Sequence, residues 1–91
     1  MTVYIVTYDL RAPGRSYTAL YDRLTTYTHC KALESVWLID TPQTAAQVRD
    51  NLRQVMDAND RLLVAMLSGA SAWTTMLPGA AQFLQSRFGA A

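Results

Sequence analysis

The sequence predicts an α+β fold in which an antiparallel sheet carries helices packed on one face. Segments of β-branched and aromatic residues alternate along the chain with segments of helical periodicity. The length of 91 residues suits one domain, which we expect over residues 1–88, with residues 89–91 as a frayed tail. Hydrophobic residues make up 51% of the chain and charged residues only 16%, so part of the apolar surface is expected to meet a second copy.

The first strand is predicted over residues 2–8, where every residue is β-branched or aromatic. Both faces of this strand are largely apolar, as in a strand at the centre of a sheet. Asp9 follows directly, and Pro13 with Gly14 indicates a loop. Asp9 is therefore expected where the strand gives way to the loop. Ser16 is expected to cap a first helix over residues 17–28.

The middle of the chain predicts a strand and then a helix. Residues 32–41 read as a strand that is bent or split, with a short extended piece near residues 29–33 leading into it. Thr44 and Gln47 form a capping-box pattern, in which each side chain satisfies a free backbone N–H at a helix start. We therefore expect the second helix over residues 44–56.

The last third of the chain predicts one strand and one helix. Residues 61–67, in which six apolar residues follow Arg61, form the third clear strand. Pro78 suits the first turn of a last helix over residues 79–88, because its missing N–H would be unpaired there in any case. The apolar face expected for that helix comprises Leu77, Ala81, Leu84 and Phe88.

This order of elements favours a ferredoxin-like, split βαβ sheet with both of the earlier helices on one face. A three-stranded flavodoxin-like fragment is the alternative, but three strands make a narrow doubly wound sheet. Helices on one face leave the other face of the first strand uncovered. A second protomer, laid sheet against sheet or edge to edge, is the economical cover, so we expect a homodimer.

Charge and composition restrict the classes of function. The net charge is +1, and the basic residues are interleaved with acids, so nucleic-acid binding would depend on a few residues gathered by folding or dimerisation. The single cysteine, Cys30, belongs to no metal-binding pattern and fits a reducing, cytoplasmic location. No stretch approaches the roughly 18 apolar residues of a membrane helix, so we expect no membrane partner.

Three blocks of the chain resemble one known family. Residues 3–10 form a hydrophobic strand that ends in Tyr-Asp-Leu, residues 33–39 contain a Ser-Val-aromatic core, and residues 59–64 place an aspartate before a strand. Their order and spacing resemble the CRISPR-associated protein two superfamily, and especially its small stand-alone SinR-like branch. The resemblance covers about residues 1–68.

The resemblance implies a ferredoxin-like fold, a homodimer and a role with nucleic acid. In that family the aspartate that ends the first strand lies near the dimer axis and can contribute to a divalent metal site. Some members have been assigned metal-dependent nuclease activity, and others act as non-catalytic scaffolds. Carried over to this chain, Asp9 is the expected catalytic and metal-binding residue, with Mg²⁺ or Mn²⁺ as cofactor, and Tyr8 matches its neighbour.

The residues themselves leave two interpretations of Asp9 open. Two copies of the carboxylate could share a divalent cation, which offsets their repulsion and activates a water for attack on a phosphodiester. The same residue could instead cap the loop that follows the strand. Arg11 and Arg15 could hold phosphates together with Tyr8, or pair with acids on the surface. His29, the only histidine, is expected at the far end of the first helix and away from Asp9.

The function expected from these observations is a homodimeric nucleic-acid-associated protein that acts as a Mg-dependent endonuclease of RNA or DNA. The alternative is a non-catalytic dimeric module that binds nucleic acid or a protein. A third hypothesis is an adaptor that docks an exposed sheet edge onto a larger protein.

Overall fold

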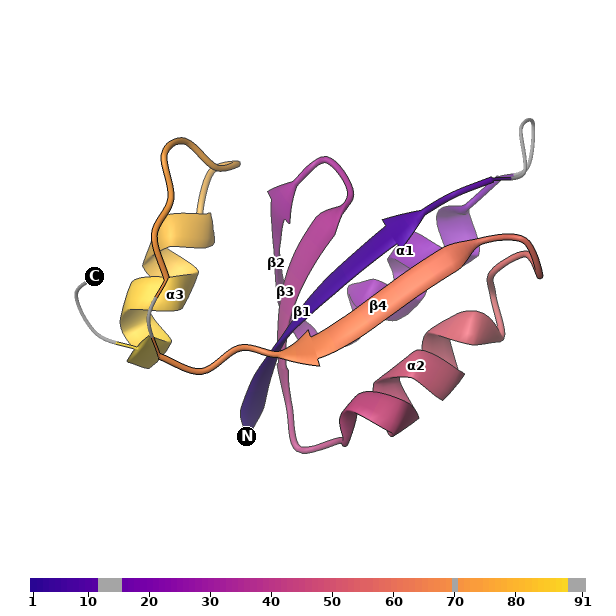
Figure 1. Ribbon diagram of the computed structural model, residues 1–91, viewed down its shortest axis with the longest axis horizontal. Coiled ribbons are helices and arrows are strands. Elements are labelled where there is room, and N and C mark those ends of the chain that lie inside the picture. The colour runs from indigo at the N-terminus through magenta and orange to yellow at the C-terminus, as the bar shows by residue number, and fades with distance from the viewer. Residues whose placement is uncertain (12–15, 70, 89–91) are drawn as a thin grey trace.

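The chain is described by a computed structural model that covers residues 1–11, 16–69 and 71–88 (Figure 1). Its elements, in order, are β1 (Thr2–Asp9), α1 (Thr18–Leu24), β2 (Thr28–Leu33), β3 (Val36–Thr41), α2 (Ala45–Arg53), β4 (Arg61–Met66) and α3 (Ala80–Phe88). The four strands form one sheet in the order β2-β3-β1-β4, and all neighbours are antiparallel. This arrangement confirms the α+β, ferredoxin-like prediction.

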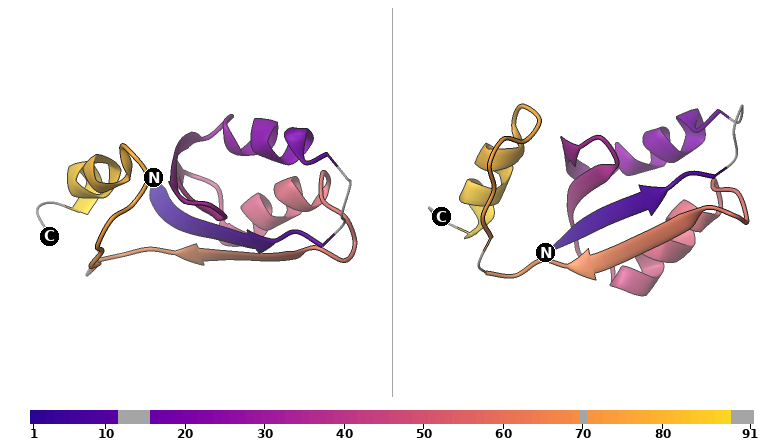
Figure 2. Two further views of the ribbon diagram at one scale, coloured as in Figure 1. Left: turned by 90° about the horizontal axis from the view of Figure 1, so that it is seen from above. Right: turned by 45° about the horizontal axis from the view of Figure 1, so that its top comes forward.

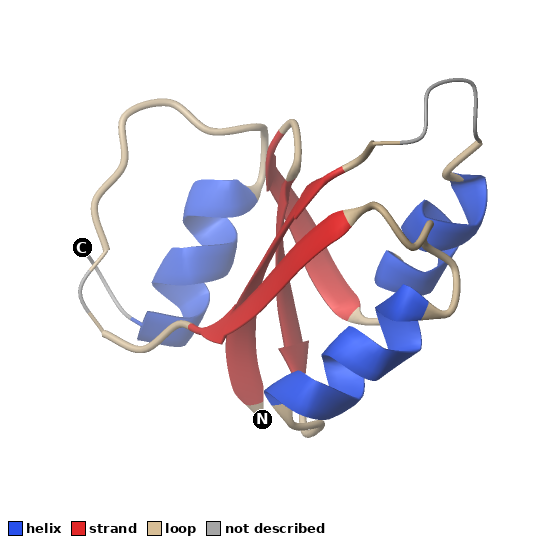
Figure 3. Cartoon of the chain, turned by 45° about the vertical axis from the view of Figure 1, so that its right-hand side comes forward, coloured by secondary structure: helices blue, strands red, loops and turns tan. Residues whose placement is uncertain are grey.

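The sheet separates two layers of helix, with α1 and α2 on one side and α3 on the other (Figure 3). Alternation along β1 produces two cores, because successive side chains of a strand point to opposite faces. Tyr4, Val6 and Tyr8 pack with α1 and α2. Val3 packs instead with Phe83 and other buried residues of α3. The sequence predicted α3, but helices were expected on one face only. The structure corrects this, because the buried residues of α3 pack against Val3 and Leu38 and cover part of the second face.

The first helix is shorter than predicted. It was expected over residues 17–28, but α1 ends at Leu24, and β2 already begins at Thr28. The hydroxyls of Thr25 and Thr26 donate to the carbonyls of Asp22 and Arg23, at 2.9 and 2.6 Å. Side-chain bonds of this kind compete with helical hydrogen bonds, which is the physical reason for the early end.

The N-terminus of α1 also differs from the prediction. Tyr17 occupies the capping position and makes no side-chain capping bond. Ser16 Oγ accepts a long bond of 3.4 Å from the backbone N–H of Thr18, and the two hydroxyl groups lie 2.9 Å apart. The expected cap at Ser16 is therefore replaced by a weaker local contact.

The predicted split of the second strand is present as a hairpin. Glu34 and Ser35 form the turn between β2 and β3. Two-residue hairpin turns usually need positive φ angles. No described residue other than glycine has a positive φ, and the register shifts instead between Lys31 and Leu33. The irregularity in β2 thus accommodates a turn of ordinary residues.

The second helix begins as predicted. Thr44 Oγ1 accepts from the N–H of Gln47 at 3.1 Å, and Gln47 Oε1 accepts from the N–H of Thr44 at 2.8 Å, so the capping box is confirmed. The helix ends earlier than residue 56, at Arg53. Its buried side chains, Val48 and Leu52, pack against the sheet.

The last helix packs over one end of the second face. Its buried residues are Ala80, Phe83 and Leu84, whereas Phe88, expected on the apolar face, is 37% exposed. Arg87 Nε donates to Asp40 Oδ2 of β3 at 2.8 Å, and the backbone N–H of Leu77 donates to the carbonyl of Ala32 in β2 at 2.9 Å. Figure 2 shows the long connection from β4 that carries the chain to this position.

Candidate functional site

The end of the second sheet face away from α3 is open, and it contains Asp9. The register of β1 and β4 places Thr7 opposite Leu63 and Asp9 opposite Arg61. Directly opposed residues of antiparallel strands share a face. Leu63 is 57% exposed, and Asp9 and Arg61 are also exposed. We call these four residues the open sheet face.

The Asp9 carboxylate lies between two guanidinium groups. Asp9 Oδ2 is 3.5 Å from Nη1 of Arg11 and 3.5 Å from Nη1 of Arg61. More than half of the Asp9 side chain is exposed, and Arg61 is more exposed still. Exposed pairs of this kind contribute about 0–1 kcal/mol. The carboxylate is therefore held loosely and can exchange an arginine for another cation at small cost.

Asp60 fixes the backbone that follows Asp9. Its Oδ1 accepts from the N–H of Arg11 at 2.7 Å and from the hydroxyl of Tyr17 at 2.8 Å. Its Oδ2 accepts from the N–H of Asp57 at 2.8 Å. One carboxylate thus joins the end of β1, the start of α1 and the turn before β4. The loop-capping role considered for Asp9 is filled at Arg11 by Asp60.

Tyr8 lies on the other face, in contradiction to its predicted contact with nucleic acid. Its side chain is only 8% exposed and belongs to the core under α1 and α2. The Nε1–H of Trp37 donates to the Tyr8 hydroxyl at 3.0 Å. Burial raises the pKa of Tyr8 above its ordinary value, and the bond from Trp37 acts in the opposite direction. Tyr8 is therefore a structural residue.

The other predicted residues are distributed as follows. Arg11 lies beside Asp9 as expected, whereas Arg15 falls outside the described residues. His29 is on β2, two strands away from β1, with Nδ1 2.9 Å from the carbonyl oxygen of Tyr27 and its ring 5.7 Å from that of Trp37. Its ring lies against the helix-side core, so His29 and Asp9 do not form a joint site within one chain.

Metal ligands are sparse in a single copy. Within residues 1–11, 16–69 and 71–88, no three His, Cys, Asp or Glu side chains are grouped so that they could hold a metal ion. Asp9 alone supplies one carboxylate on the open sheet face. Mg²⁺ is commonly bound by one or two carboxylates together with waters and substrate phosphates. The residues therefore fit a divalent cation only if a second Asp9 or a phosphate completes the site.

Two participants in the site were missed by the sequence analysis. Arg61 begins the third predicted strand, and Asp60 entered only as the aspartate before that strand in the family resemblance. Both reach the end of β1 through antiparallel pairing of β1 with β4. Apart from Arg61, β4 is apolar on both faces, so no alternation in the sequence indicates which residues of β1 lie opposite it.

Comparison with known proteins supports the fold. No protein-family model matches this chain. The chain is similar to the crystal structure of a hypothetical protein TT1823 from Thermus thermophilus, with a TM-score of 0.65 and 20% sequence identity. The similarity covers 82% of this chain and 93% of that chain. Among the described residues, no helix is long and apolar enough to span a membrane.

Proposed function

We propose that this protein is a homodimer that binds nucleic acid through the rim of the open sheet face. The proposal depends on one observation: the Asp9 carboxylate lies on an exposed, partly apolar sheet face between Arg11 and Arg61. In this dimer the open sheet faces meet around a two-fold axis, with Asp9 of each copy near the axis. The family resemblance of the sequence points to the same arrangement.

The chemistry of the open sheet face favours a second copy of the chain as its partner. Leu63 offers apolar area at the centre, while Asp9 and Arg61 provide opposite charges beside it. A two-fold axis brings the same patch of both copies together, so a patch with both signs of charge can complement itself. The arginines around the two carboxylates reduce the repulsion between them.

The charge at this rim suits a phosphate backbone. Each copy contributes two guanidinium groups and one carboxylate, so the local charge is +1 per chain and +2 per dimer. Arginine binds phosphate oxygens with two parallel hydrogen bonds, which makes Arg11 and Arg61 the expected contacts. Binding through so few charges should weaken steeply as salt is added.

Metal-dependent cleavage of RNA or DNA is the finer form of this proposal. The two Asp9 carboxylates would hold Mg²⁺ or Mn²⁺ together with a phosphate of the substrate. A divalent cation in that position supplies an activated water for phosphodiester hydrolysis. The loose pairing of Asp9 with its arginines is the feature that permits such an exchange.

The dimer is tested by comparing Leu63→Glu with Met66→Glu. Both residues are exposed on β4, at 57% and 65%, but Met66 is opposite Tyr4 and so lies on the helix-side face. We expect light scattering to show a dimer for the unmodified protein and for Met66→Glu, and a monomer for Leu63→Glu. A monomeric unmodified protein, or equal effects of both variants, would contradict the proposed interface.

Nucleic-acid binding and cleavage are tested separately with fluorescently labelled RNA and DNA. We expect Arg61→Gln to weaken binding about tenfold and Asp9→Asn to preserve it or to strengthen it slightly, because one negative charge is removed. If the protein cleaves, Mg²⁺ should be required and Asp9→Asn should abolish the activity while binding remains. Cleavage that survives in Asp9→Asn would exclude a catalytic role for this residue.

A non-catalytic module is the second candidate. It is favoured by the presence of a single carboxylate on the open sheet face and by the separation of His29 from it. Binding without cleavage in the presence of Mg²⁺ and Mn²⁺ would support this form. Failure to bind RNA or DNA would leave a protein partner, docked on a sheet edge, as the remaining adaptor hypothesis.

A further inference from the structure

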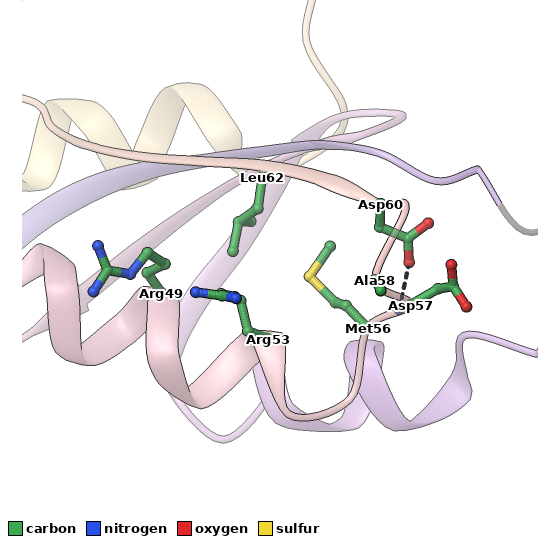
Figure 4. A pocket seen from close by; sticks show the side chains of 7 residues that line it. All are labelled: Arg49, Arg53, Met56, Asp57, Ala58, Asp60 and Leu62. Carbon is green, nitrogen blue, oxygen red and sulfur yellow. Dashed lines mark hydrogen bonds between the residues drawn. The ribbon is translucent and has the colours of Figure 1, made fainter.

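A second site candidate lies on the other side of the sheet from Asp9. A hollow of about 500 Å³ is formed where α2 and the following turn approach β4 (Figure 4). Ligand pockets commonly measure about 300–1,000 Å³, so this hollow can hold a small organic molecule. Its lining residues are Arg49, Arg53, Met56, Asp57, Ala58, Asp60 and Leu62.

One end of the hollow is cationic. Arg49 and Arg53 are one helical turn apart on α2, and Figure 4 shows both side chains at the end away from the two aspartates. Within the described part of the chain, the one ion pair of Arg49 is with its exposed neighbour Asp50, at 2.9 Å. Among the described residues, no acid forms an ion pair with Arg53. Two guanidinium groups with so little neutralisation favour an anionic group, and above all a phosphate.

The middle of the hollow is apolar, and its other end is acidic. Met56 and Leu62 lie between the arginines and the aspartates. A methionine side chain makes favourable contacts with aromatic rings. At the far end, carboxylate oxygens of Asp57 and Asp60 accept hydrogen bonds from backbone N–H groups of the turn. Their negative charge disfavours a second anion there.

We propose that this hollow binds a nucleoside monophosphate. The phosphate pairs with Arg49 and Arg53, and the base lies against Met56 and Leu62. A ligand with an anion at one end and a flat, weakly polar ring at the other matches the division of the hollow into a cationic and an apolar part. The same chemistry occurs in a free nucleotide and in the phosphorylated end of an oligonucleotide. This site does not depend on the dimer or on Asp9.

The probe is adenosine 5′-monophosphate, because a purine offers the larger ring face. Isothermal titration should show saturable binding of this nucleotide, and both adenosine and inorganic phosphate should bind at least about tenfold more weakly. Equal binding of adenosine would exclude the phosphate contact. Absence of nucleotide binding at millimolar concentration would overturn the proposal.

Charge variants locate the site. We expect Arg53→Gln to weaken binding about tenfold and Arg49→Gln with Arg53→Gln to remove it. Lys31→Gln, on the opposite edge strand, is the matched control and should leave affinity unchanged. Equal loss in Lys31→Gln would show a general charge effect and would contradict the site. Folding of each variant is checked by its thermal unfolding curve.

The source of the phosphate is distinguished by two oligonucleotides that differ only in a 5′-phosphate. If the site takes the end of a strand, the phosphorylated oligonucleotide should bind more tightly, and Arg53→Gln should remove this difference. If it takes a free nucleotide, the two oligonucleotides should bind equally and the mononucleotide should not compete with them. Arg61 does not line the hollow, so Arg61→Gln should leave the affinity for adenosine 5′-monophosphate unchanged, and a loss in this variant would contradict the assignment of the nucleotide to the hollow.

Discussion

Tyr8 and Asp9 are neighbours in the chain with opposite environments. Tyr8 is buried beneath the helices and receives the hydrogen bond of Trp37, whereas Asp9 is exposed on the other face. Alternation along a strand requires this difference. The family resemblance includes the two residues as a pair and so predicts one site for both, whereas the alternation of side chains along a strand separates them.

We expect Tyr8 to make stability depend on pH in the alkaline range. The pKa of Tyr8 is raised in the folded protein, mainly by burial, so its contribution is complete below the unfolded pKa of about 10 and is lost as pH rises above it. Tyr8→Phe also removes the bond from Trp37 and should cost about 1 kcal/mol near pH 8. Urea unfolding at several pH values measures both effects.

The comparison variant for this prediction is Tyr21→Phe, because Tyr21 is more exposed and its hydroxyl is a smaller cause, after burial, that raises the pKa of Tyr8. Between pH 9 and pH 11, Tyr21→Phe should lose slightly less stability than the unmodified protein, because one of the smaller causes of the raised Tyr8 pKa is gone. Tyr8→Phe should lose the least stability of the three proteins over this pH range. A parallel decline in all three proteins would rule out Tyr8 as the source.

At the residue scale, the sequence predicts that Asp9 and Arg11 lie side by side, because they are close in the chain. It does not predict Arg61 or Asp60, which reach the same place only through the pairing of β1 with β4. Registers are set by hydrophobic pattern and turn geometry together. β4 is apolar on both faces, so its pattern does not select one register over another.

At the scale of the elements, the start of α2 was predicted correctly and the end of α1 was not. The capping box of α2 was predictable because Thr44 and Gln47 supply both bonds from within four residues. The end of α1 was not predictable, because threonines such as Thr25 and Thr26 also occur inside helices and do not by themselves mark a helix end. The predicted helix therefore ran on to residue 28, past the point where the hydroxyls of Thr25 and Thr26 bond back to the last helical carbonyls.

Removal of the α2 cap should destabilise the fold by a predictable amount. Thr44→Ala leaves the N–H of Gln47 without its side-chain acceptor and should lower the free energy of unfolding by about 1 kcal/mol. Thr44→Ser keeps the hydroxyl and should lie within a few tenths of a kcal/mol of the unmodified protein. Chemical denaturation measures both, and equal losses would show that the hydroxyl does not act as a cap.

At the scale of the whole molecule, the order of strands and helices was sufficient to predict a ferredoxin-like sheet. The position of α3 was not predictable, because periodicity shows that a helix has an apolar side but not which surface receives it. The expected stripe included Phe88, whereas the structure buries Phe83 against Val3 and Leu38. The contacts that decide this, from Arg87 to Asp40 and from Leu77 to Ala32, are distant in sequence.

The contribution of α3 to overall stability is measurable with its two phenylalanines. Phe83 is 9% exposed and Phe88 is 37% exposed on the same helix. We expect Phe83→Ala to lower the free energy of unfolding by about 3 kcal/mol, because a buried aromatic side chain is lost and a cavity remains. Phe88→Ala should cost less than about 1 kcal/mol. Similar effects of the two changes would mean that α3 is not docked in this way.

The docking of α3 over only one end of the sheet limits the geometry of assembly. A partner that approaches this face is blocked by the helix near Val3 and finds free area only beside Thr7 and Leu63. In the proposed homodimer, the two chains would therefore overlap by the ends of their sheets rather than along the full length of their strands, and the pair would be elongated. In that dimer, α3 would act as a spacer that sets the stagger between the two subunits.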